Sequence, residues 1–73
     1  LFHTGDPAAA LASFDRAIAL RADQPDAHSN RAMALHALGR YPEALESADR
    51  ALFLDPRHVQ ALNNRGLVLR ELD

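Results

Sequence analysis

Residues 36–56 read HALGRYPEALESADRALFLDP, and the spacing of their small residues decides the fold. Sliding the whole sequence by 34 positions pairs Gly5 with Gly39 and aligns the tripeptide Asp-Arg-Ala at 15–17 with the same tripeptide at 49–51. The shift gives 14 identical pairs among 39, whereas this composition gives about four by chance in a test for internal repeats. The chain therefore contains more than one copy of a 34-residue unit.

The composition disfavours several classes of protein. The chain has 73 residues, no cysteine and a formal net charge of −2, which predicts one small domain without disulfides, thiol catalysis or a Cys-based zinc site. Acidic and basic residues are mixed throughout, so nucleic acid and anionic membranes are poor candidate partners. No apolar run reaches the span of about 20 residues that a membrane helix needs, and no signal peptide is recognisable. We therefore expect a cytoplasmic protein.

The first residue is Leu1 instead of Met, so we expect the chain to be a piece of a longer protein, with a bacterial source as one candidate.

Four prolines predict four helix starts. Proline is tolerated in the first turn of a helix because its missing N–H would be unpaired there. After each proline, apolar residues recur at intervals of three and four, as on one face of a helix. Gly39 and Gly5 lie where a helix end needs left-handed backbone, and short connections make neighbouring helices antiparallel. The predicted helices run from about Pro7 to Leu20, Pro25 to Leu38, Pro42 to Leu54 and Arg57 to Leu72, and an earlier helix ends within residues 1–4.

These residues resemble the tetratricopeptide repeat family, whose helix-turn-helix unit has 34 residues with Ala, an aromatic residue and Pro in fixed positions. Ala44 and Pro56 fill the Ala and Pro positions, and Ala10 with Phe14 fills the Ala-x3-Phe pair of the preceding copy. The pattern is not complete, since His28 stands where the family favours Trp. The resemblance covers the whole chain.

The resemblance implies an all-α fold in which antiparallel helix-turn-helix repeats stack as a right-handed superhelix, a tetratricopeptide solenoid. It divides the chain into the end of one repeat at 1–24, a complete repeat at 25–58 and the first helix of a third repeat at 59–73. A concave groove is lined by the first helix of each repeat, and function is expected there. Helix axes approach to about 8–10 Å at small residues, while larger apolar residues fill the gaps between helices. The small residues are Ala32, Ala44, Ala51 and Gly66, and the larger ones are Phe14, Leu35, Leu38, Leu45 and Leu52.

The residues that packing does not use form one face on each of the two groove helices. Asn30 and Asn64 are equivalent in successive copies, and an asparagine amide can pair with both the C=O and the N–H of one residue in an extended peptide. Helices about 10 Å apart would then hold a peptide at about every third residue. This arrangement resembles the asparagine ladder of O-linked N-acetylglucosamine transferases.

Alternatives to ligand contact remain open for these residues. The two amides could bond to neighbouring helices or to solvent, and Met33 and Leu67 either line the groove or pack between repeats. The predicted peptide-binding residues are Asp26, Ser29, Asn30, Met33 and His36 on the second helix and Gln60, Asn63, Asn64, Leu67 and Arg70 on the fourth.

Other polar residues favour structural roles. Arg31 and Arg65 are equivalent in the repeat, and we expect them to form ion pairs, with Asp15 and Asp49 as candidate partners. The four histidines are scattered, whereas a helical metal site needs ligands one turn apart. No nucleophile is paired with a base. We therefore expect no catalytic residue, no metal and no cofactor in this chain.

Three functions remain open. The first is a noncatalytic module that binds an extended peptide or a partner protein in the groove. The second is a repeat arm of a larger enzyme, such as a glycosyltransferase or sulfotransferase of bacterial type, with its catalytic domain outside this chain. The third is self-association into a homo-oligomer, because Leu1, Phe2 and the apolar stripe ending at Leu72 lack the polar capping helix that solenoids normally need.

Overall fold

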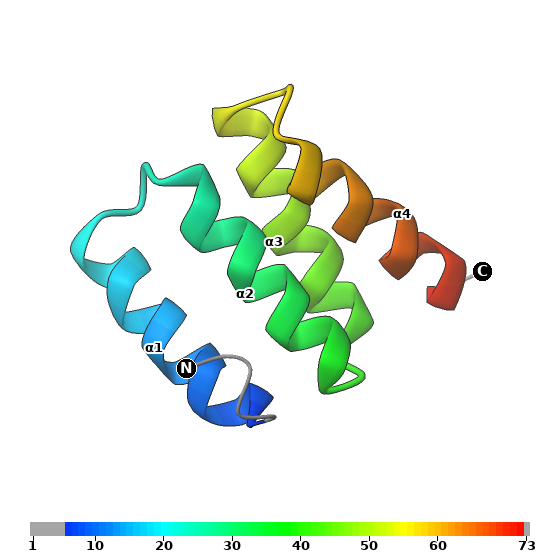
Figure 1. Cartoon of the computed structure of the whole chain (residues 1–73), viewed down its shortest axis with the longest axis horizontal. Coiled ribbons are helices and arrows are strands. Elements are labelled where there is room, and N and C mark those ends of the chain that lie inside the picture. Colours follow the sequence, from blue (N-terminus) through cyan, green and yellow to red (C-terminus); the bar gives the residue numbers. More distant parts are fainter. Residues whose placement is uncertain (1–5, 73) are drawn as a thin grey trace.

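The computed structural model describes residues 6–72, where every regular element is an α-helix. Consecutive helices run antiparallel and lie side by side in chain order (Figure 1), which confirms the predicted all-α helical repeat. The helix end predicted at residues 1–4, its cap Gly5, and Leu1 and Phe2 lie outside the described residues. The helices are α1 (Pro7–Leu20), α2 (Pro25–Ala37), α3 (Tyr41–Leu54) and α4 (Val59–Leu72).

Proline opens the first three helices as predicted. Pro7 and Pro25 are the first residues of α1 and α2, and Pro42 is the second residue of α3. Before α1, a side-chain oxygen of Asp6 accepts a hydrogen bond from the backbone N–H of Ala9 at 3.1 Å. This bond satisfies one of the N–H groups that a helix start leaves unpaired.

The fourth predicted start is wrong, because α4 begins at Val59 and not at Arg57. Pro56 lies in a turn in which the carbonyl oxygen of Asp55 accepts from the N–H of His58 at 3.1 Å. The side chain of Asp55 also accepts from the N–H of Arg57 at 3.1 Å. Asp at the first position of a turn and Pro at the second are both favourable, so turn formation prevails over helix initiation here.

Gly39 ends α2 in the left-handed conformation that the sequence predicts, with a φ of +76°. The helix stops at Ala37, one residue before the predicted end. The N–H of Arg40 donates to the carbonyl oxygen of Leu35 at 2.9 Å, and the N–H of Gly39 donates to that of His36 at 3.0 Å. These two bonds are the Schellman motif, which pairs the last carbonyl groups of a helix and reverses the chain.

Fully buried alanines lie where the helices meet. α2 packs against α1 and α3, and α4 packs against α3 and α2. The apolar cluster at the centre joins Leu11, Leu35 and Val68 from three helices. Small side chains at the contacts let the helix axes come close. The fully buried alanines are Ala32, Ala34, Ala44, Ala48, Ala51 and Ala61.

Two of the predicted packing residues behave differently. Gly66 is exposed, and no atom of another helix lies within 4 Å of the place that a Cβ would take, so within residues 6–72 it brings no helices together. Leu38 is 37% exposed because it lies in the cap of α2. Across the same residues, no helix combines the length and the apolar character that a membrane crossing requires.

The two described glycines predict opposite effects of the same substitution. We expect Gly39→Ala to destabilise the chain by about 1 kcal/mol, because an L residue with a Cβ is strained at positive φ. Gly66→Ala should stabilise it by about 0.5–1 kcal/mol, because Gly66 lies inside α4 with open space around it and Ala is the better helix former. Urea unfolding followed by circular dichroism measures both, and shifts of the same sign would contradict this account.

Candidate functional site

The predicted site residues lie on α2 and α4, which contact each other across the chain. Eight of them retain exposed surface, and we call these residues the α2/α4 surface. Those that are exposed are Asp26, Asn63, Leu67 and Arg70, and those that are half-buried are Asn30, Met33, His36 and Gln60. Ser29 and Asn64 are buried.

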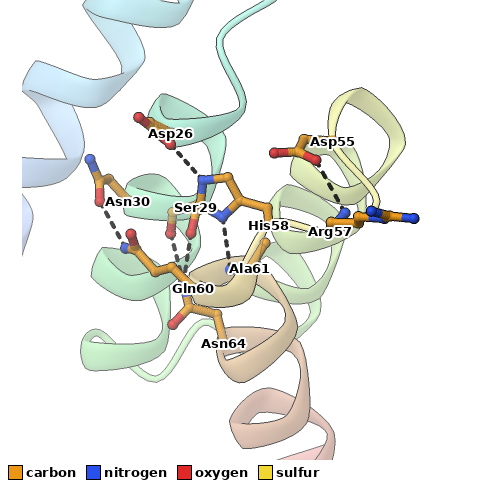
Figure 2. Close-up of polar contacts among 9 residues, drawn as sticks. All are labelled: Asp26, Ser29, Asn30, Asp55, Arg57, His58, Gln60, Ala61 and Asn64. Atoms are coloured by element: carbon orange, nitrogen blue, oxygen red, sulfur yellow. Dashed lines mark hydrogen bonds and ion pairs between the residues drawn. The ribbon is translucent and has the colours of Figure 1, made fainter.

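Asn64 joins the two helices. Its Nδ2 group donates to the backbone carbonyl oxygen of Ser29 at 2.9 Å and to the hydroxyl oxygen of Ser29 at 3.2 Å (Figure 2). Asn64 is 7% exposed and Ser29 is fully buried. Both side chains are thus engaged between the two helices, as in the alternative left open for Asn64, and their contact with a peptide stays a prediction.

Asn30 also contacts the neighbouring helix, but with only part of its amide. Its Oδ1 atom accepts a hydrogen bond from Nε2 of Gln60 at 2.9 Å. The nitrogen of Asn30 points away from Gln60 in Figure 2. The Asn30 amide thus keeps a donor group that is not used in this contact, and Gln60 keeps its carbonyl oxygen.

His58 was not predicted as a site residue, yet it connects α4 to α2. Its Nδ1 atom accepts from the backbone N–H of Ala61 at 3.1 Å, so the imidazole caps the start of α4. Its Nε2 atom lies 2.5 Å from Oδ1 of Asp26, and both contacts appear in Figure 2. Because Nδ1 is the acceptor, Nε2 carries the proton and donates it to Asp26. Its position directly before a helix is the only sequence signal for this role, and His is not a common cap.

His36 lies at the opposite end of the contact between α2 and α4. Its ring is tilted by 54° against Tyr41, with 5.5 Å between the ring centres. Its Nε2 atom is 4.0 Å from a carboxylate oxygen of Glu71 and has no hydrogen-bond partner within the described residues. His58 and His36 therefore place a histidine and a carboxylate at each end of the α2/α4 surface.

The two equivalent arginines form the ion pairs that the sequence predicts. Arg31 Nε donates to Asp15 at 2.6 Å, and Arg65 Nε donates to Asp49 at 2.8 Å. Arg31 makes a further bond, from Nη1 to the hydroxyl oxygen of Ser47 at 2.5 Å. These contacts link neighbouring helices, so both arginines are structural.

A separate ion pair stabilises the start of α3. Arg40 donates from Nε and Nη2 to the two carboxylate oxygens of Glu43, each at 2.7 Å. These hydrogen bonds hold the pKa of Glu43 below its usual value and raise the pKa of Arg40. Glu43 lies in the first turn of α3, where a negative charge also interacts favourably with the helix dipole.

The available groups are suited to noncovalent recognition. The α2/α4 surface combines amides at Asn30 and Asn63 with the apolar side chains of Met33 and Leu67 and the guanidinium of Arg70. Within residues 6–72, no three His, Cys, Asp or Glu side chains gather where they could hold a metal ion. The surface can therefore offer hydrogen bonds, apolar contact and one positive charge to a ligand.

Comparison with known proteins agrees with the repeat found in the sequence. The family model described as Tetratricopeptide repeat matches residues 1–58 and also residues 37–73. The chain is 43% identical over 61 residues to the TPR repeat-containing thioredoxin TTL4 of Arabidopsis thaliana. This match covers 84% of the present chain and 9% of the plant protein. The chain thus spans a small part of the length of this relative.

Adjacent asparagines on α4 provide a matched test of the buried contact. We expect Asn64→Ala to reduce the free energy of unfolding by about 1–2 kcal/mol, because it removes a buried hydrogen-bond donor between helices. Asn63→Ala should change it by less than about 0.5 kcal/mol, because this side chain is exposed. Both substitutions change helix propensity equally, so the difference reports the contact. Equal losses in urea unfolding would show that the Asn64 contact contributes nothing.

Substitutions of His58 test its double role. We expect His58→Ala to destabilise the chain by about 1–2 kcal/mol, because it removes the helix cap and the bond to Asp26. His58→Asn should retain more stability, since Asn caps helices well although it is too short to keep the bond to Asp26. Thermal unfolding shows which of the two variants is more stable. An Asn variant that is no more stable than the Ala variant would argue against the capping role of His58.

Proposed function

The chain belongs to the tetratricopeptide repeat family, and we propose that it binds an extended peptide or an extended segment of a partner protein on its α2/α4 surface. Repeats of this family generally mediate protein–protein interactions and are typically noncatalytic. The proposal assigns the complete repeat to residues 25–58, so that α2 and α4 are the equivalent first helices of two successive repeats.

One observation carries the proposal: α2 and α4 contact each other and present amide groups that their mutual bonds do not use. The Asn30 nitrogen is not engaged by Gln60, and the exposed Asn63 lies one residue from the buried Asn64. Asn30 and Asn63, which are not equivalent under the 34-residue shift, are therefore the two amides that we propose contact the peptide. An amide that offers both donor and acceptor fits the backbone of an extended peptide.

Apolar and charged groups on the same surface suggest what the peptide contains. Leu67 is 44% exposed and Met33 is half-buried, so an apolar side chain of the ligand could cover both. Arg70 is exposed one helical turn beyond Leu67, and a guanidinium pairs well with a carboxylate. The proposed ligand is thus an extended peptide with one apolar and one acidic residue.

The similarity to the plant protein TTL4 suggests a second part of this proposal, which concerns the protein beyond this chain. The printed name of TTL4 joins TPR repeats to a thioredoxin, and the present chain matches 9% of its length. We propose by analogy that this chain is a repeat arm in a longer protein that has a further domain. Reading the coding sequence on both sides of this segment tests this second part, and flanking sequence that contains only further repeats would contradict it.

A peptide screen tests the binding proposal. We expect the chain to select peptides of about 10 residues, which span about 33 Å when extended, from a random displayed library. Binding of the selected peptides to the Asn30→Ala plus Asn63→Ala double variant should be about tenfold weaker, because each hydrogen bond lost costs about 0.5–1.5 kcal/mol.

The matched control is Arg16→Ala plus Arg50→Ala, which changes two exposed residues on α1 and α3. This control should bind the selected peptides as the unsubstituted chain does. A peptide that is lost by the control and kept by the asparagine variant would place binding elsewhere and contradict the proposal. Circular dichroism confirms that each variant is folded.

A further inference from the structure

Two helices of this chain begin with the same kind of cap but with different acceptors. Before α1, a carboxylate oxygen of Asp6 accepts from the N–H of Ala9 at 3.1 Å. Before α4, Nδ1 of His58 accepts from the N–H of Ala61 at 3.1 Å (Figure 2), and we call this bond the His58 cap. Each bond joins residues three apart, as side-chain caps do. The two caps therefore differ in the pH range over which the acceptor keeps its lone pair.

The acceptor of the His58 cap exists only while the ring is neutral. Nε2 of His58 faces Oδ1 of Asp26, and a carboxylate accepts hydrogen bonds, so Nε2 carries the proton and Nδ1 offers the lone pair. A second proton can bind only at Nδ1, where it would point at the N–H of Ala61. Histidine ordinarily changes its charge between about pH 5 and pH 8, whereas a free carboxylate takes up its proton at about pH 4. The cap of α4 is therefore the one that responds near neutral pH.

The surroundings of His58 oppose the second proton more than they favour it. The ring faces Asp26, whose side chain is 83% exposed, so the added attraction between opposite charges is screened by water. The neutral ring already donates to Asp26, and protonation adds no new hydrogen bond there. Against this attraction stand the loss of the cap, the burial of a ring that is only 11% exposed, and a positive charge at a helix N-terminus.

Other titratable groups lie on the elements that surround His58. In the same turn, the carboxylate of Asp55 accepts from the N–H of Arg57, and the Arg57 side chain points away from the imidazole in Figure 2. On α2, Nε2 of His28 bonds to the carbonyl oxygen of Ala22. The last turn of α3, residues 51–54, has only apolar side chains. Within residues 6–72, Asp26 is thus the one carboxylate that forms an ion pair with His58.

We propose that His58 makes the contact between α2 and α4 sensitive to pH, because the second proton breaks the His58 cap and frees the first turn of α4. Gln60 lies in this turn and holds the amide of Asn30 on α2, so the α2/α4 surface loses this bond when the turn frays. The bond from Asn64 to Ser29 contains no titratable group, and this part of the contact persists. The effect on ligand binding rests on the function proposed above, whereas the effect on stability does not.

Urea unfolding at about pH 7.5 and about pH 5.5 tests the proposal with the 73-residue chain and its His58→Asn variant. Asparagine caps helices and does not titrate in this range. Free histidine has a pKa of about 6.5. At the lower pH the unfolded chain therefore binds the proton that the folded chain resists, and stability falls as the pH falls. We expect the unfolding constant to rise by up to about tenfold more in the unsubstituted chain than in His58→Asn.

The control is His36→Gln, which removes the histidine at the other end of the α2/α4 surface and leaves the His58 cap in place. On acidification it should still lose more stability than His58→Asn does. Equal losses in His58→Asn and the unsubstituted chain would overturn the proposal. So would a smaller loss in the unsubstituted chain, which would show that attraction to Asp26 outweighs the cap.

Amide signals in ¹⁵N–¹H spectra of the unsubstituted chain give a measurement that needs no variant. The signal of Ala61 should shift along one titration curve between about pH 7.5 and about pH 5.5. The signal of Ala9, which Asp6 caps in the same way, should stay in place over this range. An Ala61 signal that does not shift would overturn the proposal, whether or not His58→Asn folds.

Selected peptides without histidine test the link to ligand binding. They should bind the unsubstituted chain about threefold more weakly at the lower pH, because the bond between Gln60 and Asn30 is lost, and His58→Asn should show less of this loss. Equal binding at both pH values, together with the expected fall in stability, would contradict regulation of the surface. If the screen selects no peptide, the function proposed above fails, and unfolding and the Ala61 signal still decide whether His58 responds to pH.

Discussion

Alanine methyl groups set the distances between the helices of this chain. Side chains as small as alanine let helix axes lie about 8–10 Å apart. The fully buried alanines include Ala32, Ala44, Ala48, Ala51 and Ala61. A larger side chain at any of these positions would force neighbouring side chains or backbone to shift, because the interior of a protein is close-packed. The other contacts between the helices form at the close spacing that small side chains permit.

Directional bonds then fix how far α2 and α4 are shifted along each other. Apolar contact alone is not directional, whereas a hydrogen bond weakens steeply when its geometry changes. Asn64 to Ser29, Gln60 to Asn30 and His58 to Asp26 provide three such bonds along one contact. From the sequence, the amides of Asn30, Gln60 and Asn64 all look available for a ligand. In the structure, part of their hydrogen-bonding capacity instead holds α2 and α4 in register, and these two helices form the proposed ligand surface.

The sequence predicts the fold well because the period of 34, the prolines and Gly39 all act locally. It predicts the site less well because Ser29 and Asn30 differ by only one position, yet Ser29 is buried and Asn30 is not. Helical spacing identifies which residues of α2 share a face. Which residues of that face become buried depends on how closely α4 packs against α2. The role of His58 was missed for a similar reason, since its partner Asp26 lies 32 residues earlier in the chain.

The ion pairs of Arg31 and Arg65 also bear on how such a chain changes length. Each joins an arginine to an aspartate 16 residues earlier, and both occupy the same place in the 34-residue unit. If recombination within a gene removed or duplicated one whole unit, the new junction would still encode an aspartate 16 residues before an arginine. The number of repeats can therefore change during evolution without a new contact between helices having to arise.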